Sequence, residues 1–139
     1  MNYLEKINEL LQPKSSLNFK VLDLFAGCGG LSLGFESIGF QTVGYEMDLK
    51  ATETYNTNLN GKCFAQKINS ETQYNEYFDI VIGGPPCQPF SVGGHQKGIE
   101  DGRNGFPSFI NAVKQIKPKI WLFENVRGIL YGTNGILMK

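Results

Sequence analysis

Residues 19–30 have the sequence FKVLDLFAGCGG. A short apolar run that ends in glycines is typical of a buried parallel strand followed by a tight turn. The apolar residues at positions 31, 33, 35 and 38 then predict a helix, and Gly39 is placed to close it. This strand, turn and helix form the first unit of an α/β fold.

The rest of the chain repeats the alternation of strand and helix. Apolar runs predict strands at residues 42–46, 62–68, 78–84 and 120–126, and helical patterns lie at residues 50–59 and 109–117. Before the first strand, apolar residues at helical spacing predict an amphipathic helix within residues 1–13. The alternation favours an α/β fold with a doubly wound, Rossmann-like parallel sheet.

The composition restricts the class of protein. The chain has 139 residues, 41% apolar and 19% charged, which suffices for one domain with a packed interior. Thirteen basic and thirteen acidic residues cancel, so no large positive field points to a nucleic-acid backbone. Without a run of about 18 apolar residues or a signal-peptide core, we expect a cytoplasmic protein that does not bind membranes.

The three cysteines, Cys28, Cys63 and Cys87, have no C-x-x-C spacing, so we expect neither a disulfide framework nor a metal site. Cys87 follows the fourth strand on backbone stiffened by two prolines, which makes it a candidate nucleophile. We interpret Cys63 as a core residue. Cys28 lies within the glycine turn, without an evident base beside it.

Residues 88–105 contain five glycines and almost no apolar residues, which predicts a long mobile loop with a function. Arg103 in this loop could donate paired hydrogen bonds to a ligand or form a salt bridge. His95 could serve as a base for Cys87, although a solvated histidine is the simpler interpretation.

Ligands of an open α/β sheet bind beyond the carboxyl ends of its strands. The turn Gly27–Gly30 could bring backbone N–H groups to a ligand or serve the fold alone. Ser32 stands where a G-x-G-x-x-G dinucleotide motif has its third glycine. Glu46 ends the second strand and could accept hydrogen bonds from both ribose hydroxyls, while Met47 could lie against a purine or fill the core.

Glu124 ends the last predicted strand. We expect partial desolvation there to raise the pKa of its carboxyl, which suits a group that carries a proton. A capping acid with a structural role is the alternative.

Three segments, DLFAGCGG (23–30), PPCQPFS (85–91) and ENV (124–126), resemble in this order the cytosine-C5 DNA methyltransferases. The resemblance covers residues 19–131. It implies a class I S-adenosylmethionine-dependent methyltransferase fold, S-adenosylmethionine as the cofactor and double-stranded DNA as the substrate.

The resemblance also implies residue roles. Cys87 matches the nucleophile, Pro86 and Glu124 match the residues that hold the amino group of cytosine, and Arg103 lies nearby in the loop. Lys67 stands where the family has an acidic residue before the isoleucine that follows the third strand. The implied cofactor contacts are Phe25, Gly27, Cys28, Gly29, Gly30, Glu46, Met47, Ile68 and Phe106.

The chemistry of cytosine explains these residue types. C5 is a poor nucleophile until a group adds to C6, which the Cys87 thiolate would do. A proton or strong hydrogen bond from Glu124 at N3 would absorb the charge that develops on the ring. Since neither the thiolate nor the methyl donor reaches a base inside a duplex, the cytosine must be flipped, and the loop at residues 88–105 is suited to close over it.

The family's later motifs and its target-recognition domain do not appear before Lys139. We therefore expect residues 1–139 to form one partial catalytic domain, the front half of a split, truncated or excised enzyme that works with a complementary chain. The alternatives are a non-catalytic cofactor-binding or assembly subunit and a tRNA-directed relative. A nicotinamide-dependent oxidoreductase is disfavoured by Ser32.

Overall fold

The computed structural model describes residues 2–12, 15–86 and 105–127. All strands pair in parallel, in the order β3-β2-β1-β4-β5. The order reverses at β1, as it does in a doubly wound sheet, so the predicted fold class is confirmed. The elements are α1 (Tyr3–Leu11), β1 (Lys20–Leu24), α2 (Gly30–Glu36), β2 (Gln41–Glu46), α3 (Leu49–Asn58), β3 (Lys62–Ala65), β4 (Ile80–Gly83), α4 (Phe106–Ile116) and β5 (Ile120–Phe123).

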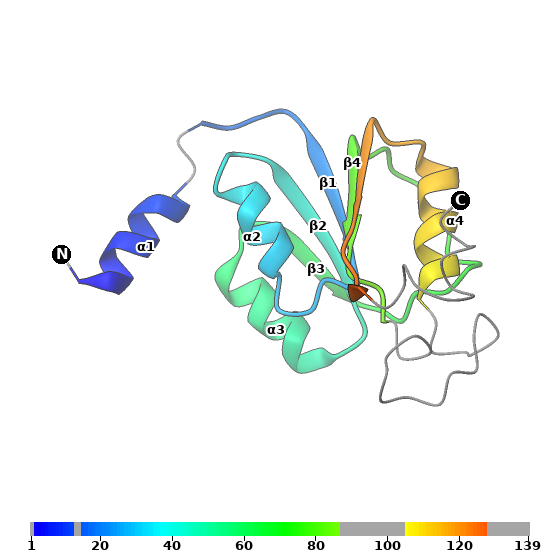
Figure 1. The fold of residues 1–139 in the computed structure, drawn as a ribbon, viewed down its shortest axis with the longest axis horizontal. Helices are drawn as coiled ribbons and strands as arrows, with labels where there is room; N and C mark the ends of the chain where they lie inside the picture. The colour runs from blue at the N-terminus through cyan, green and yellow to red at the C-terminus, as the bar shows by residue number, and fades with distance from the viewer. Residues whose placement is uncertain (1, 13–14, 87–104, 128–139) are drawn as a thin grey trace.

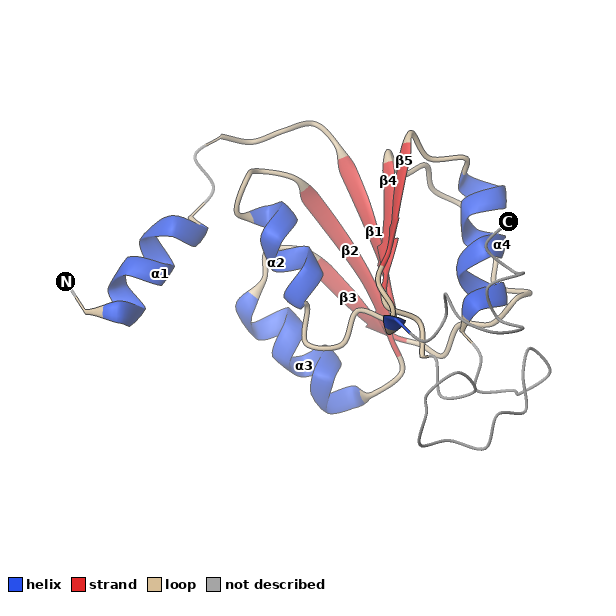
Figure 2. Ribbon diagram, in the orientation of Figure 1, coloured by secondary structure: helices blue, strands red, loops and turns tan. Residues whose placement is uncertain are grey.

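The sheet lies between two layers of helices, with α2 and α3 on one face and α4 on the other (Figures 1 and 2). Val21 and Ile82 pack with Phe35 in one cluster, whereas Leu22 packs with Phe109 in another. Each such buried apolar side chain contributes about 1.5 to 3 kcal/mol through the hydrophobic effect. Since β1 is buried on both faces, its apolar run lacks the alternation of a half-exposed strand.

The helix α1 projects away from the sheet (Figure 1). It begins with a capping box, because Glu5 N donates to Asn2 Oδ1 at 2.9 Å and Asn2 N donates to Glu5 Oε2 at 2.8 Å. The predicted N-terminal helix is therefore present, with Tyr3 and Leu10 exposed.

Several element boundaries differ from the sequence prediction; the strands expected at 78–84 and 120–126, for example, are shorter, at Ile80–Gly83 and Ile120–Phe123. The third strand was expected to reach residue 68 but ends at Ala65, and Ile68 is buried in the core beyond it. The helix expected at 109–117 begins at Phe106, with Pro107 in the first turn, where a proline is tolerated because the N–H it lacks has no intrahelical partner. Within the described ranges, no helix has the length and apolar character needed to cross a membrane.

Candidate active site

The turn after β1 has an unusual backbone. Phe25, Gly27 and Gly29 all have positive φ angles, of 61°, 55° and 90°. Gly29 also has no room for a side chain, since a Cβ there would lie 2.7 Å from a ring carbon of Tyr55. At Gly27 and Gly30, by contrast, an added Cβ would meet open space, so a ligand can approach this backbone closely.

Glu46, the last residue of β2, is bonded to this turn. Its Oε2 accepts from Gly27 N at 2.9 Å, and its Oε1 accepts from Asp48 N at 2.8 Å. A carboxylate offers about four lone-pair sites, so each oxygen retains capacity for a further donor. The structure thus brings together the glycine turn and the carboxylate that the sequence singled out separately.

Asp23 lies beneath the turn and was missed as a candidate. It is 1% exposed and accepts from Ser32 Oγ at 2.7 Å, which ties the end of β1 to α2. Burial raises the pKa of its carboxyl to about 6, with the charge of Glu46 acting in the same direction. Its Oδ1 has no protein partner. A carboxyl inside an apolar strand was the available signal, but its partner nine positions later could not be inferred from periodicity.

The remaining predicted cofactor residues differ in exposure. Met47, beside Glu46, is 68% exposed, so it is not a core residue in this structure. Cys28 is exposed at the turn, whereas Ile68 is buried. Phe106, at the start of α4, packs edge-to-face on Phe123 with ring centroids 5.4 Å apart. Phe106 therefore adjoins the carboxyl end of β5.

The carboxyl ends of β4 and β5 are joined by polar contacts. Glu124 N donates to Gly83 O at 3.0 Å, and Asn125 Nδ2 donates to Pro85 O at 3.0 Å. A Cβ on Gly84 would lie 2.9 Å from Glu124 Oε2, so the carboxylate lies against the segment that leads to Pro86. These contacts bring Glu124 beside the backbone that precedes Cys87.

We expected partial desolvation of the Glu124 carboxyl, and this expectation is wrong in the structure as described, because the side chain is exposed. The physical reason is its place at the end of β5, the edge strand of the sheet. The predicted residues Cys87 and Arg103, together with His95 and most of the loop at 88–105, lie outside the described residues. Gly105 is described and immediately precedes α4.

Cys63 is 1% exposed, as expected for a core cysteine, and burial raises the pKa of its thiol. It packs with Tyr55 and Ala26 behind the glycine turn. No group of three His, Cys, Asp or Glu side chains suitable for a metal ion occurs in the part of the chain that the structure describes.

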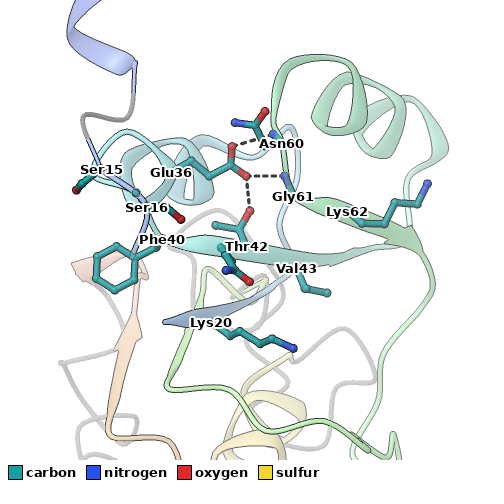
Figure 3. Close-up of a pocket in the computed structure, with 12 residues that line it drawn as sticks. Ser15, Ser16, Lys20, Glu36, Phe40, Thr42, Val43, Asn60, Gly61 and Lys62 are labelled. Carbon is teal, nitrogen blue, oxygen red and sulfur yellow. Dashed lines mark hydrogen bonds between the residues drawn. The ribbon is translucent and has the colours of Figure 1, made fainter. Parts of the chain in front are cut away.

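A cavity of about 460 Å³ lies at the opposite end of the sheet, where Lys20, Gln41 and Lys62 begin their strands. Figure 3 shows that the Glu36 carboxylate is hydrogen-bonded to the Thr42 side chain and to the backbone at Asn60 and Gly61. Asn60 N and Gly61 N each donate to the Glu36 carboxylate at 2.8 Å. This cavity is therefore separate from the predicted site at the carboxyl ends of the strands.

Solved structures place the fold in one class. A TehB-like SAM-dependent methyltransferase from Corynebacterium glutamicum superposes with a TM-score of 0.60 at 15% identity, covering 89% of this chain and 64% of that chain. The T. thermophilus 16S rRNA N2 G1207 methyltransferase RsmC, solved with AdoMet and guanosine, gives a TM-score of 0.56 at 29% identity, covering 81% and 30%. The chain has the class I SAM-dependent methyltransferase fold, with a partial sheet.

Sequence comparison defines the family within that class. The pattern of the C-5 cytosine-specific DNA methylases matches residues 19–139, so the chain belongs to this family. It is 48% identical over 141 residues to the Type II methyltransferase M.AplI of Arthrospira platensis, covering all of this chain and 41% of that protein. The Type II methyltransferase M.FnuDI of Fusobacterium nucleatum is 42% identical over 83% of this chain and 34% of its own length. The chain thus spans well under half of each relative.

Proposed function

We propose that this chain supplies the cofactor-binding and nucleophile-bearing part of a DNA cytosine-C5 methyltransferase that acts on double-stranded DNA. The observation that carries the proposal is the family match over residues 19–139. The turn Gly27–Gly30, Glu46 and Glu124 support it, because all three lie at the carboxyl ends of parallel strands, where this class of fold binds ligands.

The residues of the turn fit S-adenosylmethionine. Gly27 and Gly30 leave the backbone open to a ligand, and Glu46 beside them offers acceptors for two ribose hydroxyls. Met47 is exposed next to Glu46, where its thioether can lie against an adenine face. When bound, S-adenosylmethionine supplies an electrophilic methyl group. In the proposed site Phe25, Phe106 and Ile68 provide the apolar contacts.

The proposed reaction takes place on a cytosine flipped out of the duplex. The Cys87 thiolate adds to C6 and forms a carbon–sulfur bond, while Glu124 stabilises the charge at N3 with a hydrogen bond or proton. Pro86 and Arg103 hold the base. The cofactor would supply the methyl group for C5 and leave as S-adenosylhomocysteine, and loss of the C5 proton to a base would release the Cys87 thiolate from C6.

A second candidate is a cofactor-binding or assembly subunit that needs a complementary chain. The exposed apolar side chains of β5 favour it, with Ile120 61%, Trp121 54% and Leu122 44% exposed. A strand edge of this kind accepts another strand.

Trapping of the covalent adduct tests the enzymatic proposal. Duplex DNA containing 5-fluorocytosine is mixed with S-adenosylmethionine and the chain, with and without the complementary portion of a relative, and the product is analysed by mass spectrometry. With the complementary portion present, we expect an adduct that Cys87→Ser abolishes and Cys63→Ala retains. A parallel reaction uses tRNA containing 5-fluorocytosine, and an adduct with tRNA alone would favour the tRNA-directed alternative. Cofactor binding without an adduct on either nucleic acid would favour the non-catalytic subunit.

A further inference from the structure

Gly105 is a buried glycine whose backbone conformation does not require glycine. Its φ and ψ angles are −79° and −7°, which any residue can adopt, and it is the residue before the first turn of α4. The reason for glycine at this position must therefore lie in the surroundings of its α-carbon.

Three side chains occupy the space that a larger residue at Gly105 would need. A Cβ there would lie 2.7 Å from Pro85 Cβ, 2.8 Å from Phe25 Cζ and 2.8 Å from Pro86 Cδ. Distances below 3.0 Å are repulsive between carbon atoms, so even one methyl group would displace at least one of these neighbours.

The three neighbours belong to two different parts of the proposed site. Phe25 opens the glycine turn and has a φ angle of 61°, a conformation that costs a non-glycine residue energy. Pro85 and Pro86 directly precede Cys87, and Pro86 O accepts from Gly105 N at 3.4 Å. Gly105 is thus the point where the cofactor turn and the proline pair meet.

We propose that Gly105 is a positioning residue that holds Phe25, and with it the cofactor turn, at close spacing from the proline pair before Cys87. This inference rests on the proposed function, because it takes Phe25 as a cofactor contact. The absence of a side chain at Gly105 lets the aromatic ring and the two pyrrolidine rings converge. A methyl group there pushes Phe25 out of the position in which the turn receives its ligand.

A double-mutant cycle on cofactor affinity tests the inference. S-Adenosylhomocysteine binding is measured by calorimetry for the wild-type chain, Gly105→Ala, Phe25→Leu and the double variant. We expect Gly105→Ala to weaken binding about tenfold in the wild-type background. In the Phe25→Leu background the loss of affinity should be smaller, because leucine lacks the ring end that the methyl group meets and only the contacts with Pro85 and Pro86 remain.

Gly34→Ala is the matched control, because a Cβ at Gly34 in α2 meets nothing within 4 Å. It should bind like the wild type. Fluorescence of Trp121, the only tryptophan, reports whether each variant is folded, and if Gly105→Ala alone fails to fold, the double variant should be more stable than Gly105→Ala because one of the three contacts is relieved. Equal affinity of Gly105→Ala and wild type, or an equal loss in both backgrounds, overturns the inference. Absence of binding to the wild type overturns instead the cofactor part of the proposed function.

Discussion

Asp23 is a carboxyl residue in largely apolar surroundings. Its carboxyl is buried in β1 and accepts a hydrogen bond from the Ser32 hydroxyl. Removal from water disfavours the charged form, so burial raises the pKa from 3.8 to about 6. This raised pKa links the stability of the sheet to pH at the root of the proposed cofactor turn.

The sign of that linkage gives a testable prediction. Below about pH 4 Asp23 is neutral in both states, and as pH rises toward 6 the unfolded chain ionises first, so stability is lost across this window. Asp23→Asn keeps an oxygen for Ser32 and carries no charge. The free energy of unfolding of Asp23→Asn, taken relative to that of the wild type, should therefore increase by up to about 3 kcal/mol between pH 4 and pH 8. Urea unfolding at several pH values measures the free energy of unfolding of both proteins. If the two free energies change with pH in the same way, the prediction is contradicted.

Glu46 carries the second prediction at this scale. Glu46→Ala should weaken S-adenosylhomocysteine binding by about 1 to 3 kcal/mol, since it removes the proposed ribose acceptors and the bond to Gly27 N. Glu53→Ala on the exposed side of α3 removes the same charge and should bind like the wild type. Calorimetry compares the two variants. Tighter binding of NAD than of S-adenosylhomocysteine by the wild type would contradict the assignment.

Among the elements, α4 ends in a strained conformation. Lys117 has a φ angle of 50°, and its N–H donates to Val113 O at 2.9 Å. Left-handed backbone costs a residue with a Cβ about 1 kcal/mol, whereas glycine adopts it freely. Lys117→Gly should therefore raise the free energy of unfolding by about 0.5 to 1 kcal/mol in urea titrations. Lys114→Gly, inside the same helix, should lower it by about 1 kcal/mol, and the same sign in both variants would refute the explanation.

The sequence predicted those helices and strands whose pattern of apolar residues depends on the element itself. The buried strands were found because parallel strands covered on both faces are apolar throughout, as at Val21 and Val81. The predicted helix began at residue 109, three residues after the start of α4, because Gly105 and Pro107 are typical of loops. Proline is nevertheless favoured in a first helical turn. The bond from Ser32 to Asp23 and the packing around Gly105 join residues distant in sequence. The spacing of apolar residues within one helix or strand does not reveal such contacts.

For the whole molecule, the edge strand β5 determines how the isolated chain behaves in solution. Ile120 and Leu122 are in register with Ile80 and Ile82 of β4, yet both are exposed. We expect concentration-dependent self-association through this edge, and Leu122→Lys should reduce it because a charge at an open edge opposes strand pairing. Sedimentation velocity over a range of concentrations measures it. A wild-type chain that stays monomeric throughout would show that the edge does not associate.

The last prediction concerns DNA. The formal net charge of the chain is zero, so release of counterions from the duplex can contribute little affinity, and base contacts alone seldom compensate. The chain also spans 41% of the relative M.AplI. We therefore expect the isolated chain to transfer negligible labelled methyl from S-adenosylmethionine to DNA even at low salt. Addition of the remaining portion of such a relative should restore turnover, and Cys87→Ser should abolish it again, because that portion organises the site but does not replace the nucleophile. Robust, sequence-specific turnover by the chain alone would contradict this expectation, since it would require that these 139 residues hold both the flipped base and the duplex.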